Sequence, residues 1–344
     1  MSAPKMFGAD WLMQQEFPPL QYVVPGIIPE GMSLLVAAPK IGKSWMVLGL
    51  GITLSQGGDA FGVLPVGSPR PVLYLALEDG HRRLQSRIHS MGAGRLDARL
   101  QFVTELQPGQ VLRTISNYIN AFAGSDPVVI LDTLGKVMPP AGNSNAYAHD
   151  YKVLSELKAT CDAVPGSSLL IVHHTRKSDA GDFLDAVSGT QGIAGAADSV
   201  LVLRRERLEK RAILNVTSRD AAEGEYALTM SESGVWTLDG ESLEQAQNNA
   251  RIVKANKSVG EPMLELIETV NRFPEGIKAG ALRQLLPGQP NLNEYLRRAV
   301  EAERIRKLER GLYAPVTSGT LRLSGSESHN IPQISLPLES DFAA

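Results

Sequence analysis

The sequence predicts an α/β protein: a mostly parallel sheet covered by helices, with an antiparallel extension and a small C-terminal domain. Three observations predict it. Through the first half of the chain, short apolar runs rich in branched residues alternate with segments of helical period. Four further apolar runs then follow one another with short turns and no helix between them. Beyond a polar stretch near residue 240, a compact group of helical segments ends in a hairpin.

The parallel part of the sheet is predicted from five apolar runs, which are typical of strands covered on both faces. We expect these strands at 33–37, 71–77, 100–104, 128–132 and 168–173. The helices between them are expected at 43–55, 82–91, 111–123 and 150–162. Two segments without a strong period follow parallel strands, where α/β sheets carry ligand-facing loops, and they span 139–149 and 176–195.

The second half of the chain predicts the remaining parts. The antiparallel extension is expected at 199–203, 212–216, 226–230 and 235–238, which completes a first domain over 1–240 with a short N-terminal lead-in. A linker, in part helical, is expected over 241–260. Three short helices and a two-stranded wing over 261–315 predict a winged-helix domain, and 316–344, rich in Ser, Gly and Pro, a disordered tail.

Composition limits the class of protein. A net charge of -3 and a pI near 6.1 exclude a strongly basic chain, so any contact with DNA must be local. The single cysteine, Cys161, excludes an internal disulfide framework and a cysteine-rich zinc site. The chain shows no signal-peptide core and no run of eighteen apolar residues. These features predict a cytoplasmic protein with no membrane partner.

Residues 37–44 match the phosphate-loop consensus, with Ala37 in place of its first glycine. An apolar strand precedes the loop and an apolar-periodic helix follows it, which disfavours a chance Gly-Lys-Ser in a surface loop. Gly42 lets the backbone amides turn toward phosphates, and the new helix adds its positive end. Lys43 is expected against the β- and γ-phosphates, and the Ser44 hydroxyl on Mg²⁺. The nucleotide-binding residues are therefore predicted as Ala38, Pro39, Lys40, Ile41, Gly42, Lys43, Ser44 and Trp45.

Carboxylates at the ends of two apolar strands are candidates for the metal and the base. Asp132 ends a buried strand about ninety residues after the loop, and we expect it to hold the metal with Ser44. A strand-terminating cap of the next turn is the alternative role for Asp132. Glu78 and Asp79 end another strand, and either could align the water for hydrolysis, although this acidic pair also suits a helix cap.

Several motifs together resemble one family. The segments 76–80, 172–178, 188–190, 197–201 and 217–220 occur in the order seen in RecA-like ATPases of the RepA type, which are hexameric replicative helicases of plasmids and phages. The lead-in at 20–31 resembles the family's segment before the phosphate loop, and the chain is more distantly similar to DnaB. The resemblance covers about residues 15–240.

This resemblance implies roles for individual residues. Because a RecA-like sheet delivers the catalytic glutamate from the strand next to the phosphate-loop strand, it favours Glu78 over Asp79. It makes His174 a sensor of the γ-phosphate and leaves His173 to packing. Arg219 matches an arginine finger that completes a neighbouring subunit's site, so it implies a homo-oligomer. DnaB-type proteins carry a lysine two positions before the arginine finger, where this chain has Thr217. The alternative for Arg219 is an ordinary solvated arginine at the end of a strand.

Two regions are candidates for nucleic-acid contact. The loop at 176–195 corresponds to the family's central-channel loop, where Arg176 and Lys177 would meet phosphates together with Lys136. Phe183 is the one aromatic residue among them, and an ordinary solvated loop is the alternative. In the predicted winged helix, the third helix carries Arg297 and Arg298 but also Glu294 and Glu301, so DNA binding and protein docking both stay open.

The sequence therefore predicts an ATPase that uses ATP and Mg²⁺ and assembles into a hexameric ring. Its expected activity is that of a replicative DNA helicase translocating on single-stranded DNA, with a replication-initiation protein or a primase as a further partner. The alternatives are a recombination or regulatory ATPase that binds DNA without unwinding it, and a nucleotide-dependent switch that docks proteins through its C-terminal module.

Overall fold

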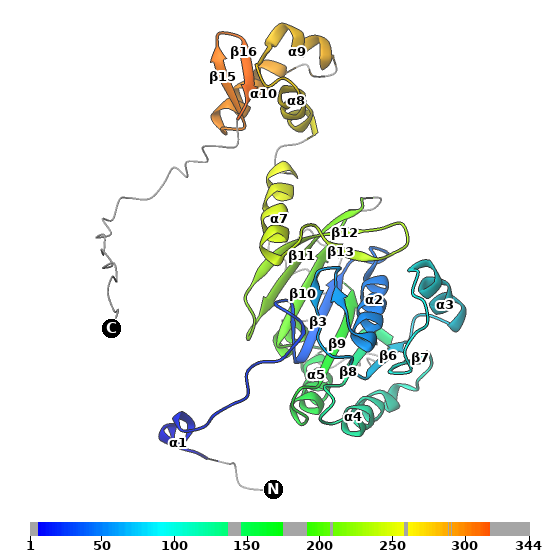
Figure 1. The fold of residues 1–344 in the computed structure, drawn as a ribbon. Helices are drawn as coiled ribbons and strands as arrows, with labels where there is room; N and C mark the ends of the chain where they lie inside the picture. Colours follow the sequence, from blue (N-terminus) through cyan, green and yellow to red (C-terminus); the bar gives the residue numbers. More distant parts are fainter. Residues whose placement is uncertain are drawn as a thin grey trace, which may run out of the picture. The chain divides into compact units, whose positions relative to one another are not determined.

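The computed structural model describes residues 6–136, 146–174, 191–206, 209–257, 261–287, 289 and 291–316. The chain separates into two compact units, residues 1–255 and 256–344 (Figure 1). The predicted tail beyond Val316, the loop that carries Arg176 and Lys177, and most of the loop at 139–149 lie outside the described residues. Within the described part, no helix is both long and apolar enough to cross a membrane.

A nine-stranded sheet forms the centre of the first unit, in the order β13-β12-β11-β10-β3-β9-β8-β6-β7. The strands of its predicted parallel part are β3 (Gly31–Ala37), β6 (Val72–Ala76), β7 (Leu100–Val103), β8 (Val128–Asp132) and β9 (Ser168–His174). The other four are β10 (Ser199–Arg204), β11 (Arg211–Ser218), β12 (Gly224–Met230) and β13 (Trp236–Leu238). All nine lie within two residues of their predicted bounds at either end, because long branched apolar runs are a strong strand signal.

The direction of one strand differs from the prediction. The antiparallel extension was expected to begin at residue 199, but β10 pairs with β3 in parallel, with Ser199 opposite Ser33. Antiparallel pairing begins one strand later, between β10 and β11, where Ser199 lies opposite Ser218. Helix α6 (Gln191–Ala196) comes just before β10 and so belongs to the crossover that brings this strand in parallel to β3.

Helices cover both faces of this sheet, because each central strand is apolar on both sides. In β6, Val72 and Tyr74 belong to the hydrophobic cluster on the side of α2 (Lys43–Gln56). Leu73 and Leu75 point the other way and join the cluster with α4 (Val111–Ala121) and α5 (Ala146–Asp162). Figure 1 shows these helices around the sheet.

The remaining elements of the first unit are short or peripheral. They are α1 (Ala9–Met13), β1 (Tyr22–Val24), β2 (Ile28–Pro29), β4 (Asp59–Ala60), β5 (Leu64–Pro65), α3 (His81–Ser90) and the 3₁₀ turns Pro108–Gln110 and Leu134–Lys136. Helix α7 (Leu243–Lys257) occupies most of the predicted linker. Its Ala246 and Ala250 are fully buried, and Ala250 packs against Ile213 and Ala227 of the sheet. This segment is therefore a packed helix of the first unit over most of its length.

The second unit has a hydrophobic core of its own, built around Leu266, Leu282 and Leu296. Its helices are α8 (Glu261–Asn271), α9 (Ala279–Leu285) and α10 (Leu292–Glu301). A small sheet in the order β14-β16-β15 joins Ile277–Lys278, Leu312–Pro315 and Ile305–Glu309. Three helices with a hairpin are the elements expected from the sequence, and β14 adds a third short strand to that hairpin.

Candidate functional site

The register of the parallel strands brings the predicted chemical residues to one edge of the sheet. Ala37, the last residue of β3, lies opposite His174, the last of β9. Asp132 ends β8, and its neighbour in β6 is Ala76, two residues before Glu78. Because all four strands run in the same direction, the residues that follow them meet at the carboxyl edge, where α/β sheets bind ligands.

A cavity of about 660 Å³ opens at this edge. Its lining combines the phosphate loop, the acidic strand ends and three arginines: Pro39, Lys40, Gly42, Lys43, Ser44, Trp45, Glu78, Asp79, Arg83, Arg87, Asp132, Thr133, His174, Arg205 and Met230. The structure thus gathers Lys43, Ser44, Asp132, Glu78 and His174, which the sequence places up to 131 residues apart. Ala38 and Ile41 belong to the same loop without lining the cavity.

The phosphate loop is held by residues that come much later in the sequence, on β13 and just after β10. Lys40 and Gly42 both have positive φ, 66° and 104°. The indole Nε1 of Trp236, in β13, donates to the carbonyl of Gly42 at 3.1 Å. Arg205 lies over the ring of Trp236 and donates to the carbonyl of Ile41 at 3.3 Å. Trp236 on β13 and Arg205 just beyond β10 therefore hold the backbone of the phosphate loop.

We expect Gly42→Ala to weaken nucleotide binding by at least about tenfold. A Cβ at Gly42 would lie 2.9 Å from both Met230 Sδ and Trp236 Cζ2, and the left-handed conformation itself costs an ordinary residue about 1–2 kcal/mol. The measurement is titration with a fluorescent ATP analogue. Gly67→Ala is the matched control, because Gly67 also has positive φ but has open space around it. Equal affinity of both variants would contradict this account of the loop.

Lys43 is buried and turned onto its own loop. Its ammonium donates to the carbonyls of Ala37 at 2.6 Å and Ala38 at 3.0 Å, and it lies 3.0 Å from His174 Nδ1. Burial lowers the pKa of Lys43 to about 8, although the nearby charges of Asp132 and Glu78 act to raise it. In the nucleotide-free protein this lysine therefore loses its charge as the pH rises through about 8.

Nucleotide binding at about pH 8.5 should be accompanied by uptake of a proton at Lys43, because phosphate oxygens favour the charged ammonium. Calorimetric titrations in two buffers of different ionisation enthalpy measure the uptake, which should be much smaller at about pH 7. Binding heats at about pH 8.5 that do not depend on the buffer would contradict it. Since the folded pKa lies below 10.5, this group also makes the free protein more stable as the pH rises from about 8 toward that value.

Asp132 offers a free acceptor to a metal ion. Its side chain is buried, and Oδ2 accepts a hydrogen bond from the buried Tyr74 hydroxyl at 2.8 Å. Burial raises the pKa of Asp132, while hydrogen bonds from Ser44 and Tyr74 act to lower it. Within the described residues Oδ1 has no hydrogen-bond partner. A buried carboxylate oxygen without a donor, beside the Ser44 hydroxyl and the phosphate loop, fits Mg²⁺.

Glu78 and Asp79 differ clearly in their surroundings. Glu78 accepts a hydrogen bond from the Thr133 hydroxyl at 3.0 Å and lies 3.8 Å from His174 Nε2. Asp79 is buried and forms ion pairs with Arg83, in the first turn of α3, and with Arg87, in its last turn. Because two arginines occupy Asp79, Glu78 is the carboxylate available to a water in the cavity.

The prediction of which strand lies next to the phosphate-loop strand was wrong. The resemblance predicted that the strand that carries Glu78 lies next to β3, but β9 and β8 lie between β3 and β6. Glu78 reaches the cavity because it lies two residues beyond the end of β6, so the chain has left the sheet at that point. His174, at the end of β9, lies between Lys43 and Glu78 instead.

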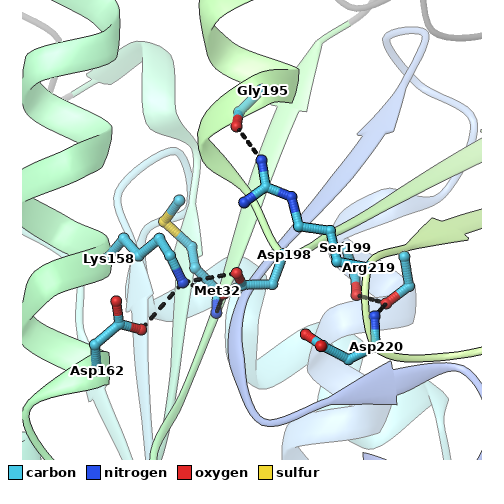
Figure 2. A network of polar contacts seen from close by, with 9 residues as sticks. Met32, Lys158, Asp162, Gly195, Asp198, Ser199, Arg219 and Asp220 are labelled. Atoms are coloured by element: carbon cyan, nitrogen blue, oxygen red, sulfur yellow. Dashed lines mark hydrogen bonds and ion pairs between the residues drawn. The ribbon is translucent and has the colours of Figure 1, made fainter. Parts of the chain in front are cut away.

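Arg219 lies at the opposite edge of the sheet, because it follows Ser218, whose neighbour Ser199 pairs with Ser33 near the start of β3. Figure 2 shows the contacts around it. Its backbone N–H donates to the carbonyl of Asp198, whose own N–H donates to the carbonyl of Met32 near the start of β3. Met32 precedes Ala37 by five residues, which at about 3.3 Å each is about 17 Å of strand. The Arg219 guanidinium donates to the carbonyl of Gly195 at 2.7 Å. It therefore cannot reach the cavity of its own chain.

The described candidates for DNA contact are solvent-exposed. Lys136 lies just beyond β8, at the same edge as the cavity. Arg297 and Arg298 are exposed on α10, and Arg297 pairs at 3.5 Å with Glu301 on the same helix.

Of the two neighbouring histidines, His174 lines the cavity and His173 does not.

Sequence reasoning missed several residues of the site, among them Tyr74, Thr133, Arg205 and Trp236. Tyr74 had a detectable signal, because a tyrosine inside an otherwise aliphatic strand needs a partner for its hydroxyl. Thr133 follows Asp132 directly and could have been considered with it. Arg205 and Trp236 gave no local signal, since their contacts with the loop join residues as far as 194 positions apart.

Comparison with known proteins adds one family model and several solved structures. The model described as an AAA domain matches residues 3–180. One solved ATPase domain is 13% identical over 60% of this chain and 84% of its own, with a TM-score of 0.48. A DnaB-like replicative helicase, solved for its interactions with primase, is 14% identical over 60% of this chain and 57% of its own, with a TM-score of 0.48. A KaiC-like protein from Pyrococcus horikoshii OT3 is 14% identical over 63% of this chain and 94% of its own, with a TM-score of 0.44.

Proposed function

Because the chain belongs to the AAA domain family and is a RecA-like P-loop ATPase, we propose that it is an ATP-driven motor of the DnaB-like kind. The proposed motor is a hexameric ring that moves along single-stranded DNA as a replicative helicase. One observation supports it above the others: Lys43, Asp132, Glu78 and His174 surround one cavity while Arg219 lies at the opposite edge of the sheet.

The residues of the cavity divide the work of hydrolysis. The Ser44 hydroxyl and Asp132 Oδ1 would hold a Mg²⁺ ion, which would supply positive charge to the phosphate oxygens. Tyr74 fixes the other oxygen of Asp132. Lys43 leaves the carbonyls of its own loop to meet the phosphates. Glu78, oriented by Thr133, aligns the attacking water.

We propose that His174 reports the state of the nucleotide site. Its Nδ1 lies 3.0 Å from Lys43 Nζ, and its Nε2 lies 3.8 Å from Glu78 Oε1. A γ-phosphate that draws Lys43 away also removes one partner of His174, so the imidazole must take a new one. This exchange of partners is the proposed sensor step. His174 is the last residue of β9, and the loop that carries Arg176 and Lys177 follows it directly in the sequence.

The position of Arg219 supports an assembly of several copies. Its guanidinium is remote from the cavity of its own chain, so it can stabilise charge only at the nucleotide of another copy. A contact that joins one edge of a subunit to the opposite edge of the next is heterologous, and repetition of it gives a ring or a filament. A hexameric ring is the form we propose.

The proposed contacts with DNA are electrostatic. Lys136, Arg176 and Lys177 would grip the phosphates of a single strand. We also propose that the second unit is a winged helix whose Arg297 and Arg298 touch DNA, although Glu294 and Glu301 on the same helix would also suit a protein partner. A replication-initiation protein or a primase is the further partner that we propose.

Electron microscopy with a non-hydrolysable ATP analogue tests the assembly, with and without a short oligothymidine. We expect rings that enclose the strand, and an ATPase rate that rises when single-stranded DNA is added. Slow turnover that DNA does not change would overturn the motor and favour a nucleotide-dependent switch. DNA-stimulated turnover without strand separation on a forked substrate would favour a DNA-binding ATPase that does not unwind.

A further inference from the structure

Asp198 lies where several elements meet at the amino edge of the sheet. Its side chain is only 12% exposed, and it accepts hydrogen bonds from Lys158 Nζ at 2.6 and 2.7 Å. The backbone N–H of Met32 donates to the same carboxylate at 3.0 Å. Figure 2 shows the lysine reaching this carboxylate from α5. The side chain of Asp198 thus ties α5 to the first residues of β3.

The backbone of Asp198 carries this connection on to Arg219. The Asp198 N–H donates to the carbonyl of Met32 at 2.9 Å, and the Asp198 carbonyl accepts from the Arg219 N–H at 3.0 Å. Both backbone groups and both carboxylate oxygens of one residue are therefore engaged. A shift of Asp198 would pass directly to the backbone of Arg219.

The Asp198 carboxylate fits beside β3 because the first residue of that strand is a glycine. Gly31 has a φ of +88°, and a Cβ there would lie 2.8 Å from Asp198 Oδ2. Burial acts to lower the pKa of Lys158, but its hydrogen bonds to Asp198 and Asp162 outweigh burial and the pKa is raised. Lys158 therefore stays charged at neutral pH, and the pair has the geometry of a strong charge-assisted contact.

The turn around Arg219 is fixed on its other side as well. Ser218 Oγ accepts hydrogen bonds from Ser199 Oγ at 2.7 Å, from the Asp220 N–H at 3.2 Å and from the Ala221 N–H at 3.0 Å. Arg219 thus begins a well-defined turn, and its guanidinium extends to the carbonyl of Gly195. The backbone is held while the charged group remains at the surface.

We propose that Lys158 and Asp198 are positioning residues for Arg219: they set the strand end from which the guanidinium reaches the nucleotide of the adjacent copy. This inference rests on the proposed role of Arg219 between copies. Charge stabilisation requires close placement, and a displacement of about 1 Å can cost about a hundredfold in rate. Loss of the Lys158–Asp198 pair should therefore reduce turnover without changing the subunit's own nucleotide cavity.

Mixed assemblies test this directly, because one subunit can supply the finger and another the nucleotide site. Arg219→Ala subunits keep an intact cavity, and Lys43→Ala subunits keep an intact Arg219, so mixing them should restore part of the hydrolysis. When mixed with Arg219→Ala subunits, Lys43→Ala/Lys158→Met subunits should restore a rate of hydrolysis about tenfold lower than Lys43→Ala subunits restore. The KM for ATP should be unchanged, because the hydrolysing cavities are the same in both mixtures.

Matched variants separate positioning from folding. Lys43→Ala/Lys152→Met is the control, since Lys152 is exposed on the same helix and should restore as much as Lys43→Ala. Lys43→Ala/Asp198→Asn keeps the side-chain size and should show the same deficit, with a Tm near that of Lys43→Ala. Full restoration by a stable Asp198→Asn or Lys158→Met donor would overturn the proposal. No restoration by Lys43→Ala itself would instead refute the role of Arg219.

Discussion

Glu78→Gln is expected to bind ATP with unchanged affinity and to hydrolyse it about 10²–10⁴-fold more slowly. The amide keeps the size of the side chain and can still accept the hydrogen bond from Thr133 at 3.0 Å. It can no longer take a proton from water. The measurement is single-turnover hydrolysis alongside equilibrium binding of an ATP analogue.

The matched control is Glu105→Gln, because Glu105 is an exposed glutamate just beyond the neighbouring strand β7 and does not line the cavity. It should hydrolyse ATP like the wild type. Lys43→Ala completes the comparison, since it removes the ammonium that we propose meets the phosphates, and it should abolish binding itself. Normal turnover by Glu78→Gln would show that another group aligns the water.

Arg219→Ala is expected to lower steady-state hydrolysis by about 10³–10⁵-fold while each subunit still binds ATP. The physical reason is loss of the positive charge that, in the proposed assembly, stabilises the transition state at the adjacent copy. Because the guanidinium lies at the edge of the sheet opposite the cavity, removing it should leave the Lys43 and Asp132 contacts untouched. The measurement is the ATPase rate of the assembled protein as a function of protein concentration.

Mixing distinguishes a finger from a structural residue. Lys43→Ala subunits added to Arg219→Ala subunits should recover part of the rate, since each supplies what the other lacks. Arg113→Ala is a suitable control, because Arg113 is an exposed arginine on α4. It should hydrolyse like the wild type without mixing. If Arg219→Ala is as active as Arg113→Ala, the solvated strand-end alternative is correct.

Local patterns predicted the strands well, and the pairing of strands less well. Runs such as Val128–Asp132 are apolar up to their last residue and buried throughout, so both their existence and their burial follow from the sequence. The direction of β10 does not, because residues 199–204 read the same whether the strand runs parallel or antiparallel to its neighbour. The order of the strands could not be predicted from local patterns either. The place of β6 beyond β9 and β8 depends on how the connections between strands pack on the sheet.

In the site, too, local motifs were predictable from the sequence and contacts between distant residues were not. The motif residues Lys43, Ser44 and Asp132 were found from local spacing, and they do line one cavity. The choice between Glu78 and Asp79 rested on the resemblance, and the structure adds a physical reason, since Arg83 and Arg87 occupy Asp79. Contacts from outside the motifs could not be predicted, because nothing near Trp236 in the sequence indicates that its indole holds Gly42.

That last contact determines how the protein can be shortened. The hydrogen bond from Trp236 spans 194 residues, whereas the matched AAA domain model ends at residue 180. A fragment cut at the end of that model would keep Lys43, Ser44 and Asp132 but would lack β10 to β13, and with them the contacts of Trp236 and Arg205 on the loop. Expression of the catalytic unit by itself therefore requires the chain at least through Leu238.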